Sequence, residues 1–261
     1  MKYVKSCLII TILLGVGYSQ CDANGDGDLD VLDVVIEVNC ILSDCWTSEF
    51  SGDCIDIDGN VYETVQIGDQ LWMAENLKVT HYNNGDEISY PSSEDFGSYD
   101  GGQYGVYDNV STNADVYGNL YNWAVMDGSR GICPEGFHVP FDEEFMELEM
   151  FLGMSEEEAN SEGWRGTDEG SKLAGNSDLW LDGNLKQNPE FGISGFNALP
   201  AGYRGTNLGN YANMGNTGSF WSSSDSSSSH AWNRVLSYDY LGVVRYASSK
   251  QAGFSIHCLG D

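Results

Sequence analysis

The chain has 261 residues, which is long enough for one sizeable domain and a smaller unit beside it. Its 40 acidic residues against 11 Lys and Arg give a formal net charge of −29. This charge argues against nucleic acid and anionic membranes as partners, because both bind through basic patches. The 32 Gly, 15 Tyr and 7 Trp with only 5 Pro indicate a loop-rich protein with an aromatic core, and exclude a disordered chain.

The N-terminus has the pattern of a secretory signal peptide. Two lysines precede an apolar run over residues 7–17, which is too short for a stable membrane anchor. A small-x-small pattern favours cleavage after Ser19, so we expect residues 1–19 to be removed. The alternative is a lipoprotein acylated at Cys21, although Gln20 is bulky for that processing. No other apolar run is long enough to span a membrane, and we expect a secreted protein, soluble or attached to the cell surface.

Residues 22–33 have the pattern of a twelve-residue calcium loop. Such a loop places oxygen ligands at positions 1, 3, 5, 7, 9 and 12, with a glycine at the sharp turn of position 6. Gly27 stands at position 6, where φ is often positive. The ligand positions hold Asp22, Asn24, Asp26, Asp28, Asp30 and Asp33. The register favours a calcium site over a merely solvated acidic loop.

The segment 20–54 resembles one repeat of a dockerin, the module that attaches extracellular proteins to cohesin-bearing scaffolds. The last ligand position holds Asp33, not the bidentate Glu of calcium sensors, and an apolar run follows it. Dockerins carry two such repeats. The other candidate, around Asp56, has Cys54 at its first ligand position and Val65 at its last. We therefore expect calcium binding but consider cohesin doubtful as a partner.

Export determines how the cysteines are interpreted. Loss of Cys7 with the signal peptide leaves an even number, which in an oxidising compartment favours disulfides over metal thiolates. Four lie in the small unit, which buries little surface and needs covalent staples. These are Cys21, Cys40, Cys45 and Cys54, whose pairing the sequence leaves open. Cys133 and Cys258 are the remaining pair, and a bond between them would close a long loop.

The large domain begins with a hairpin pattern and continues into two helices. Apolar and polar residues alternate over 61–67, and a Gly-Asp turn leads into the apolar residues 71–73. Asp142 is expected to cap a helix, because apolar residues recur at helical spacing until Gly153. A capping box at Ser155 predicts a second, short helix.

The last third of the chain has the pattern of strands separated by Gly, Ser and Asp turns. The expected strands are 220–221, 231–237, 243–247 and 254–258, with the serine-rich run 222–229 as a flexible connection. A β-rich start, a helical middle and a β-rich end predict an α+β fold with an antiparallel sheet. We expect both ends of the domain, residues 56–261, to meet in that sheet.

Several blocks of the large domain resemble the Fibrobacter succinogenes major paralogous domain. They include GNLYNW at 118–123 and CPEGFHVP at 133–140. The others lie at 56–62, 64–77, 80–82, 195–203, 220–223 and 253–258, and the resemblance covers about residues 56–259. Phe137 and His257 stand where Trp and Arg are usual. The resemblance implies an exported or surface protein without established enzyme activity, and a fold similar to C-type lectins, adhesins and formylglycine-generating enzymes. Such an analogy does not transfer function.

The sequence contains no recognisable catalytic set. Its four histidines lie in unrelated contexts, and it lacks a nucleophile elbow, a zinc-protease motif and a phosphate loop. A redox or copper-binding role of Cys133 and Cys258 is the alternative to a structural disulfide, which export favours. The segment 232–234 is similar to a lectin sugar-bound calcium motif, but Arg234 stands where a carboxylate is needed. We therefore expect a protein that is not an enzyme.

Residues 203–217 form a segment rich in Gly, Asn and Tyr. Tyrosines on an adaptable backbone make good contact surfaces for sugars or proteins, and a purely structural loop is the alternative. The candidate ligand-binding residues are Tyr203, Arg204, Asn207, Asn210 and Tyr211.

The leading hypothesis is a secreted or cell-surface binding or adhesion module. Its expected ligand is a carbohydrate, a cell-envelope component or a surface protein, and its calcium site is structural. The alternative is a non-catalytic or weakly catalytic accessory protein of extracellular polysaccharide degradation, attached through the dockerin-like unit. A purely structural role in the envelope is a third hypothesis.

Overall fold

A computed structural model of the protein describes residues 7–12, 16–21, 53–92, 95–97, 101–126, 128–206 and 209–261. The chain divides into two compact units, Met1–Ser51 and Gly52–Asp261. In the first unit, β1 (Cys7–Ile12) and β2 (Val16–Cys21) form an antiparallel hairpin over the apolar run expected to be a signal peptide. The predicted calcium ligands Asp22, Asn24, Asp26, Asp28, Asp30 and Asp33 lie outside the described residues, as do Cys40 and Cys45.

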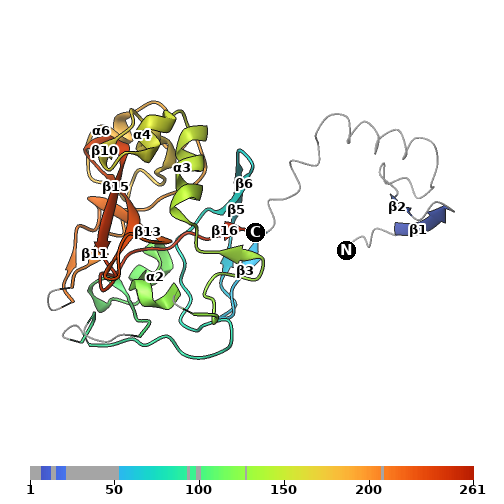
Figure 1. Cartoon of the computed structure of the whole chain (residues 1–261), viewed down its shortest axis with the longest axis horizontal. Helices are drawn as coiled ribbons and strands as arrows, with labels where there is room; N and C mark the ends of the chain where they lie inside the picture. The colour runs from blue at the N-terminus through green and yellow to red at the C-terminus, as the bar shows by residue number, and fades with distance from the viewer. Residues whose placement is uncertain are drawn as a thin grey trace. The chain divides into compact units, whose positions relative to one another are not determined.

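The second unit contains short strands and helices followed by three long strands (Figure 1). Its first part holds β3 (Cys54–Ile55), β4 (Val61–Tyr62), β5 (Thr64–Ile67), β6 (Gln70–Met73), β7 (Tyr104–Gly105), the 3₁₀ helix η2 (Tyr107–Asn109), α2 (Thr112–Tyr117), β8 (Leu120–Tyr121), η3 (Trp123–Met126) and β9 (Phe137–His138). The middle holds α3 (Asp142–Phe151), α4 (Glu156–Asn160), β10 (Gly163–Arg165), α5 (Glu169–Leu173) and α6 (Asn184–Gln187). The last part holds β11 (Tyr203–Arg204), β12 (Tyr211–Ala212), β13 (Thr217–Asp225), β14 (His230–Ser237), β15 (Tyr240–Ser249) and β16 (Leu259–Gly260).

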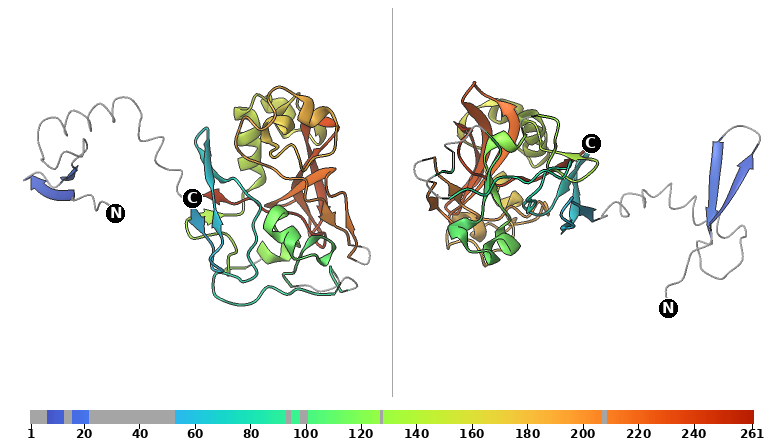
Figure 2. Two further views of the ribbon diagram at one scale, coloured as in Figure 1. Left: turned by 180° about the vertical axis from the view of Figure 1, so that it is seen from behind. Right: turned by 90° about the horizontal axis from the view of Figure 1, so that it is seen from below.

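Two four-stranded antiparallel sheets organise this unit, in the orders β10-β15-β14-β13 and β5-β6-β16-β9. In the second sheet, Leu259 of β16 lies opposite both Trp72 and His138. The first and last parts of the unit, cyan and red in Figures 1 and 2, therefore lie side by side. The α+β class with antiparallel sheets and the meeting of both ends are confirmed.

The predicted hairpin is present as β5 and β6. Thr64 lies opposite Met73 and Ile67 opposite Gln70, which leaves Gly68 and Asp69 as a two-residue turn. Gly68 has a φ of +61°. A glycine suits this turn because other residues rarely adopt positive φ without strain.

The helix predicted from Asp142 is α3, but Asp142 is its first residue and not its cap. The N-cap is Phe141, whose backbone N–H donates to the Glu144 carboxylate at 2.7 Å. Asp142 instead turns inward toward two arginines of the sheet, because their charges bind its carboxylate more strongly than a helix terminus does. The helix ends before Gly153, as predicted.

The second predicted helix, α4, begins with the expected cap. The Ser155 hydroxyl accepts the backbone N–H of Glu158 at 3.3 Å and donates to the Glu158 carboxylate at 2.8 Å. This arrangement satisfies one of the N–H groups that a helix start leaves unpaired.

The C-terminal strands differ from the predictions in two places. The serine-rich run is a strand as far as Asp225, because β13 extends through it and the Ser223 N–H donates to the Pro140 carbonyl. The predicted strand 254–258 is an extended segment with isolated bridges only. Gly253, Phe254 and Ser255 each pair with a different partner segment, so no continuous ladder forms until β16.

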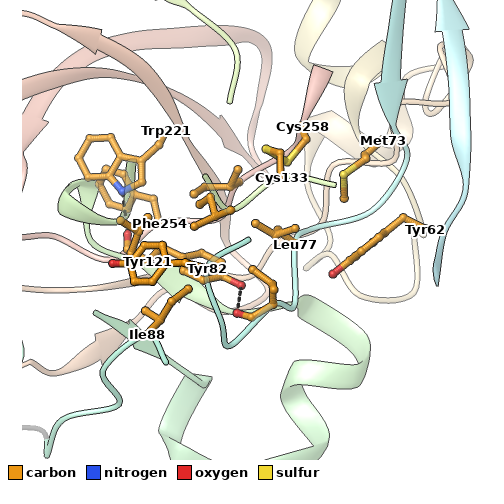
Figure 3. Close-up of a cluster of buried hydrophobic side chains, with 14 of the residues drawn as sticks. Tyr62, Met73, Leu77, Tyr82, Ile88, Tyr121, Cys133, Trp221, Phe254 and Cys258 are labelled. Atoms are coloured by element: carbon orange, nitrogen blue, oxygen red, sulfur yellow. Dashed lines mark hydrogen bonds between the residues drawn. A yellow bond between two sulfur atoms is a disulfide. The ribbon is translucent and has the colours of Figure 1, made fainter. Parts of the chain in front are cut away.

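The Cys133–Cys258 disulfide is formed, as predicted, between residues separated by 125 positions (Figure 3). It lies in a buried cluster with Met73, Leu77 and Trp221. A second cluster on the other side of the sheet β10-β15-β14-β13 contains Trp72, Phe145, Leu148, Phe196, Phe220 and Leu236. The long sheet therefore separates two hydrophobic cores.

Cys54 belongs to the large unit and not to the small one. It pairs with Tyr62 across β3 and β4, and its free thiol is buried in the core. Burial raises the pKa of this thiol to about 11, so it stays protonated and unreactive at neutral pH. Cys54 is one of the four cysteines expected to form disulfides in the small unit, but it lies in the core of the large unit.

Five charged side chains are buried between α3 and the sheet. Asp142 contacts Arg234 and Arg245, each at 2.5 Å, while Glu149 contacts Arg234 at 2.6 Å and Arg165 at 2.8 Å. Burial alone would raise the pKa of Asp142, but hydrogen bonds from Arg245 and the charge of Arg234 hold it below its ordinary value. We call these five residues the ion cluster.

Within the described residues, no helix is long and apolar enough to cross a membrane.

Removing one acid from the ion cluster is expected to destabilise the fold strongly. Asp142→Asn leaves three arginines facing one carboxylate, and breaking a buried pair in this way costs about 3 to 5 kcal/mol. Urea unfolding at pH 7 measures this loss. The control is Glu75→Gln, which breaks a more exposed pair with Lys78 and should cost less than about 1 kcal/mol. Equal effects of the two substitutions would contradict a structural role of the cluster.

Stability should also depend on His257. Its ring is fully buried and stacked on Phe196 at 4.4 Å. Burial lowers its pKa to about 3. Below a pH of about 6.5 the His257 side chain binds a proton in the unfolded chain but stays neutral in the folded chain. The free energy of unfolding therefore falls by about 1.4 kcal/mol per pH unit as the pH decreases.

The variant His257→Phe keeps an aromatic ring in this position and removes the titration. Urea unfolding between pH 7 and pH 5 should therefore show a shallower pH slope for the variant, with the stability difference small at pH 7. The exposed His230→Gln is the control and should keep the wild-type slope. Identical slopes for wild type and His257→Phe would show that His257 does not contribute.

Candidate functional site

A groove of about 660 Å³ lies between the hairpin β11–β12 and the sheet β10-β15-β14-β13. Figure 1 shows β11, β13 and β15 near one another at one side of the large unit. The groove residues used below are Tyr203 and Asn210 of the hairpin segment, Thr217 of β13, Asn233 and Val235 of β14, and Tyr246 and Ser248 of β15.

The alternation of β14 explains which of its residues face the groove. Successive side chains of a strand point to opposite faces. Asn233 and Val235 line the groove, whereas Arg234, between them, lies in the ion cluster against α3. The same alternation on β15 sends Arg245 to the ion cluster and Tyr246 to the groove.

The hairpin β11–β12 is fixed to the sheet through Gly202. The Gly202 N–H donates to the Thr217 carbonyl at 2.8 Å. Its φ is +67°, and a Cβ atom here would lie 2.2 Å from the Ala212 carbonyl oxygen. Only glycine fits this close approach, which sets the wall of the groove beside β13.

Arg204 supports the hairpin from the side opposite the groove. It is fully buried, and its Nε and NH2 groups donate to the carbonyls of Gly209 and Ser92 at 3.1 and 3.2 Å. Its guanidinium lies 4.0 Å from the Phe96 ring centre and 4.9 Å from that of Tyr211. Burial lowers the pKa of this guanidinium. Arg204 is therefore covered and does not line the groove, and its role as a ligand contact stays a prediction.

The five predicted ligand residues are thus separated by the structure. Tyr203 and Asn210 line the groove. Tyr211 stacks on Tyr107 at 5.2 Å, and its hydroxyl donates to Asn109 at 3.2 Å, outside the groove lining. Asn207 lies outside the described residues.

Two buried polar atoms at the groove lack hydrogen-bond partners in the described part of the chain. The Asn233 amide donates to the Tyr246 carbonyl at 2.9 Å and to the Ser248 hydroxyl at 2.8 Å, which leaves its Oδ1 unpaired. The Thr217 hydroxyl is also unpaired. Both atoms are covered from solvent, and an unpaired buried polar group costs about 1 to 3 kcal/mol.

The groove is uncharged although the protein is strongly acidic. None of the described residues that line it is Asp, Glu, Lys or Arg, whereas the chain carries a net charge of −29. Hydroxyl and amide groups and the His230 imidazole form its polar part, and tyrosine rings flank it at Tyr203 and Tyr246. This chemistry suits a neutral ligand with many hydroxyl groups and some apolar faces.

Sequence reasoning missed most of this site. The sequence points to Asn233 only through the lectin-like segment 232–234, to Tyr246 only through a predicted strand, and to Thr217 only as the last residue of the segment 203–217. Alternation along 231–237 and 243–247 could have placed Asn233 and Tyr246 on one face. It could not have shown that the hairpin leaves this face open, because that depends on the contact between Gly202 and β13.

A second groove, of about 620 Å³, lies beside the disulfide and contains His138. The imidazole Nδ1 lies 2.7 Å from the Asp261 carboxylate and Nε2 lies 3.0 Å from that of Glu144. Burial alone would lower the pKa of His138, but the hydrogen bonds to Glu144 and Asp261 raise it overall. With both nitrogens engaged by carboxylates, this imidazole has no free nitrogen to act as a general base or a metal ligand.

Asp56 organises a turn and does not present a free carboxylate to a cation. Its oxygens accept the backbone N–H groups of Asp58 and Asn60 at 3.0 and 2.9 Å, and the Tyr62 hydroxyl at 2.6 Å. Throughout the described ranges, no group of three or more His, Cys, Asp or Glu side chains could hold a metal ion.

The family model of the Fibrobacter succinogenes major domain matches residues 65–259, which include the first groove, the disulfide and the ion cluster. No curated protein and no solved structure matches the chain. Because the match spans most of the sequence, the chain belongs to the Fibrobacter succinogenes major domain family.

Proposed function

We propose that this protein is a secreted or cell-surface binding module and that the groove beside β11–β12 binds carbohydrate. The observation that carries the proposal is a groove lined by hydroxyl, amide and tyrosine side chains, without Asp, Glu, Lys or Arg among its described residues, in a chain of net charge −29. Sugars offer hydroxyl groups to such polar side chains, and their C–H faces pack on rings such as Tyr203 and Tyr246.

The same groove favours binding over hydrolysis. Glycoside hydrolysis uses two carboxyl groups on either side of the scissile bond. The described lining of the groove contains no carboxylate, and the histidine of the second groove has both nitrogens engaged. We therefore propose a binding role for this groove, and attachment to a larger assembly of polysaccharide-degrading proteins is compatible with a binding module.

The proposal extends to the rest of the chain. We propose a C-type lectin-like arrangement for the family domain, export through the N-terminal segment, and one structural calcium ion in the loop 22–33. The support is the register of six oxygen-bearing side chains and a glycine in that loop. The single dockerin-like repeat would then stabilise the small unit and need not dock a cohesin.

Retention on polysaccharides tests the binding site. We expect the protein to be retained by one or more neutral polysaccharides in a panel of cellulose, xylan, mannan and mixed-linkage glucan, and not by polygalacturonate. Tyr246→Ala should weaken binding by about tenfold, which corresponds to about 1.4 kcal/mol. The control is Tyr90→Ala, because Tyr90 is 47% exposed and Tyr246 is 44% exposed, but Tyr90 does not line the groove. No retention on any neutral polysaccharide would refute the proposal.

Calcium removal should destabilise the small unit but leave glycan binding by the groove unchanged. Chelation is expected to lower the melting temperature of the small unit, because metal binding is coupled to folding. Glycan binding should persist in the chelator, since a groove without carboxylates offers no ligand set for calcium. Calorimetric titration with Ca²⁺ and glycan retention in EDTA measure the two effects. Loss of glycan binding in EDTA would place calcium in the binding site and contradict this assignment.

A further inference from the structure

We propose that the carbohydrate site continues across the sheet to Trp164 on the edge strand β10, so that it binds a linear glycan chain and not a single sugar. This inference rests on the proposed function of the groove. It follows from the strand register, the exposure of the aromatic rings and the distance between them.

The register places Trp164 on the same face of the sheet as the groove. Trp164 lies opposite Val244, while its neighbours Gly163 and Arg165 lie opposite Arg245 and Val243. Arg165 and Arg245 belong to the ion cluster on the α3 face. Because side chains alternate along a strand, Trp164 and Val244 point to the opposite face, which is the groove face.

Trp164 is close enough to extend the groove. The register connects Trp164 to Val244, then to Val235 and then to Ser219, and the last two line the groove. Two strand spacings separate Trp164 from Val235, which is roughly 10 Å. Tyr246 stands two residues from Val244 on the same face and therefore lies diagonally across from Trp164. About two linked sugar rings span this distance, so a glycan that also contacts Tyr203 on the hairpin must be longer than a disaccharide.

The Trp164 ring is exposed but held in place. It is 58% exposed, whereas Trp72, Trp180 and Trp221 are buried. The Tyr240 ring meets it edge to face, with 4.7 Å between ring centres. The Tyr240 hydroxyl donates to the Arg165 carbonyl at 2.9 Å, which fixes the supporting ring. A large exposed ring with a fixed support is a preorganised platform, and ligand binding on it orders little additional structure.

The resulting track crosses the strands and combines aromatic platforms with a polar side chain. From the hairpin it contains Tyr203, then Asn233 on the groove floor, then Tyr246 and finally Trp164. A chain of neutral sugars matches this combination, because each ring has both an apolar face and a hydroxyl-bearing edge.

Dependence on chain length tests the extended site. The probes are a disaccharide and a hexasaccharide prepared from the neutral polysaccharide that the full-length protein retains. The wild-type protein should bind the hexasaccharide more tightly, and Trp164→Ala should weaken hexasaccharide binding by about fivefold to tenfold while leaving the disaccharide unchanged. The matched control is Phe151→Ala, because Phe151 is 63% exposed but lies on α3.

The outcomes distinguish this inference from the function on which it rests. Equal affinity of the wild type for both probes, or an equal loss for both in Trp164→Ala, overturns the extended site and leaves the groove proposal intact. Retention of no neutral polysaccharide overturns both. Should Trp164→Ala fail to fold, acrylamide quenching of the wild-type tryptophan fluorescence decides the question: the hexasaccharide must protect the exposed ring, and an absence of protection overturns the inference.

Discussion

The ion cluster fixes the register on which the rest of the large unit depends. Asp142 and Glu149 of α3 hold Arg234 and Arg245 on one face of the sheet. A slip of one residue would move every side chain of a strand to the other face. It would send the arginines into the groove and Asn233 into the core. The cost of leaving buried charges unpaired therefore protects the groove chemistry as well as the packing of α3.

The two faces of the long sheet β10-β15-β14-β13 therefore differ in how they are covered. One face is covered by helices and is fully packed, with Phe220 and Leu236 in its core. The other is only partly covered, since the hairpin β11–β12 contacts β13 and leaves a groove over Val235 of β14 and Tyr246 of β15. A rigid layer beneath an open face is what a binding site needs, because the scaffold keeps the contact residues in position.

The last residues of the chain connect the two hydrophobic cores of the large unit. The segment 253–258 passes between the sheets with isolated bridges, carries His257 into one core and joins the other through the disulfide at Cys258. β16 then pairs with β6. The irregular hydrogen bonding of this segment reflects its position between two sheets, where each residue meets a different neighbour.

Sequence patterns predicted the parts of this fold that depend on neighbours along the chain. The hairpin at Gly68, the cap at Ser155 and the main C-terminal strands are present as expected. The role of Asp142 was wrong, since a helix start and a buried ion pair require the same residue type at the same place. Its partners Arg234 and Arg245 are 92 and 103 positions away, beyond the reach of a local pattern.

The charge of the protein also has one part that the sequence predicts and one part that depends on the fold. Composition gives a net charge of −29 but not its distribution. The chain has only 11 Lys and Arg residues. Three of the arginines are buried in the ion cluster, and Arg204 is buried beneath the hairpin β11–β12. Among the described residues, four buried acidic residues offset these arginines, namely Asp56, Asp142, Glu149 and Glu169. The outer surface is therefore as acidic as the composition implies, and it repels anionic polymers. A groove without Asp, Glu, Lys or Arg among its described residues does not attract a ligand by charge. Its selectivity for a ligand must therefore come from shape, hydrogen bonds and aromatic contacts. These are the interactions that neutral sugars offer.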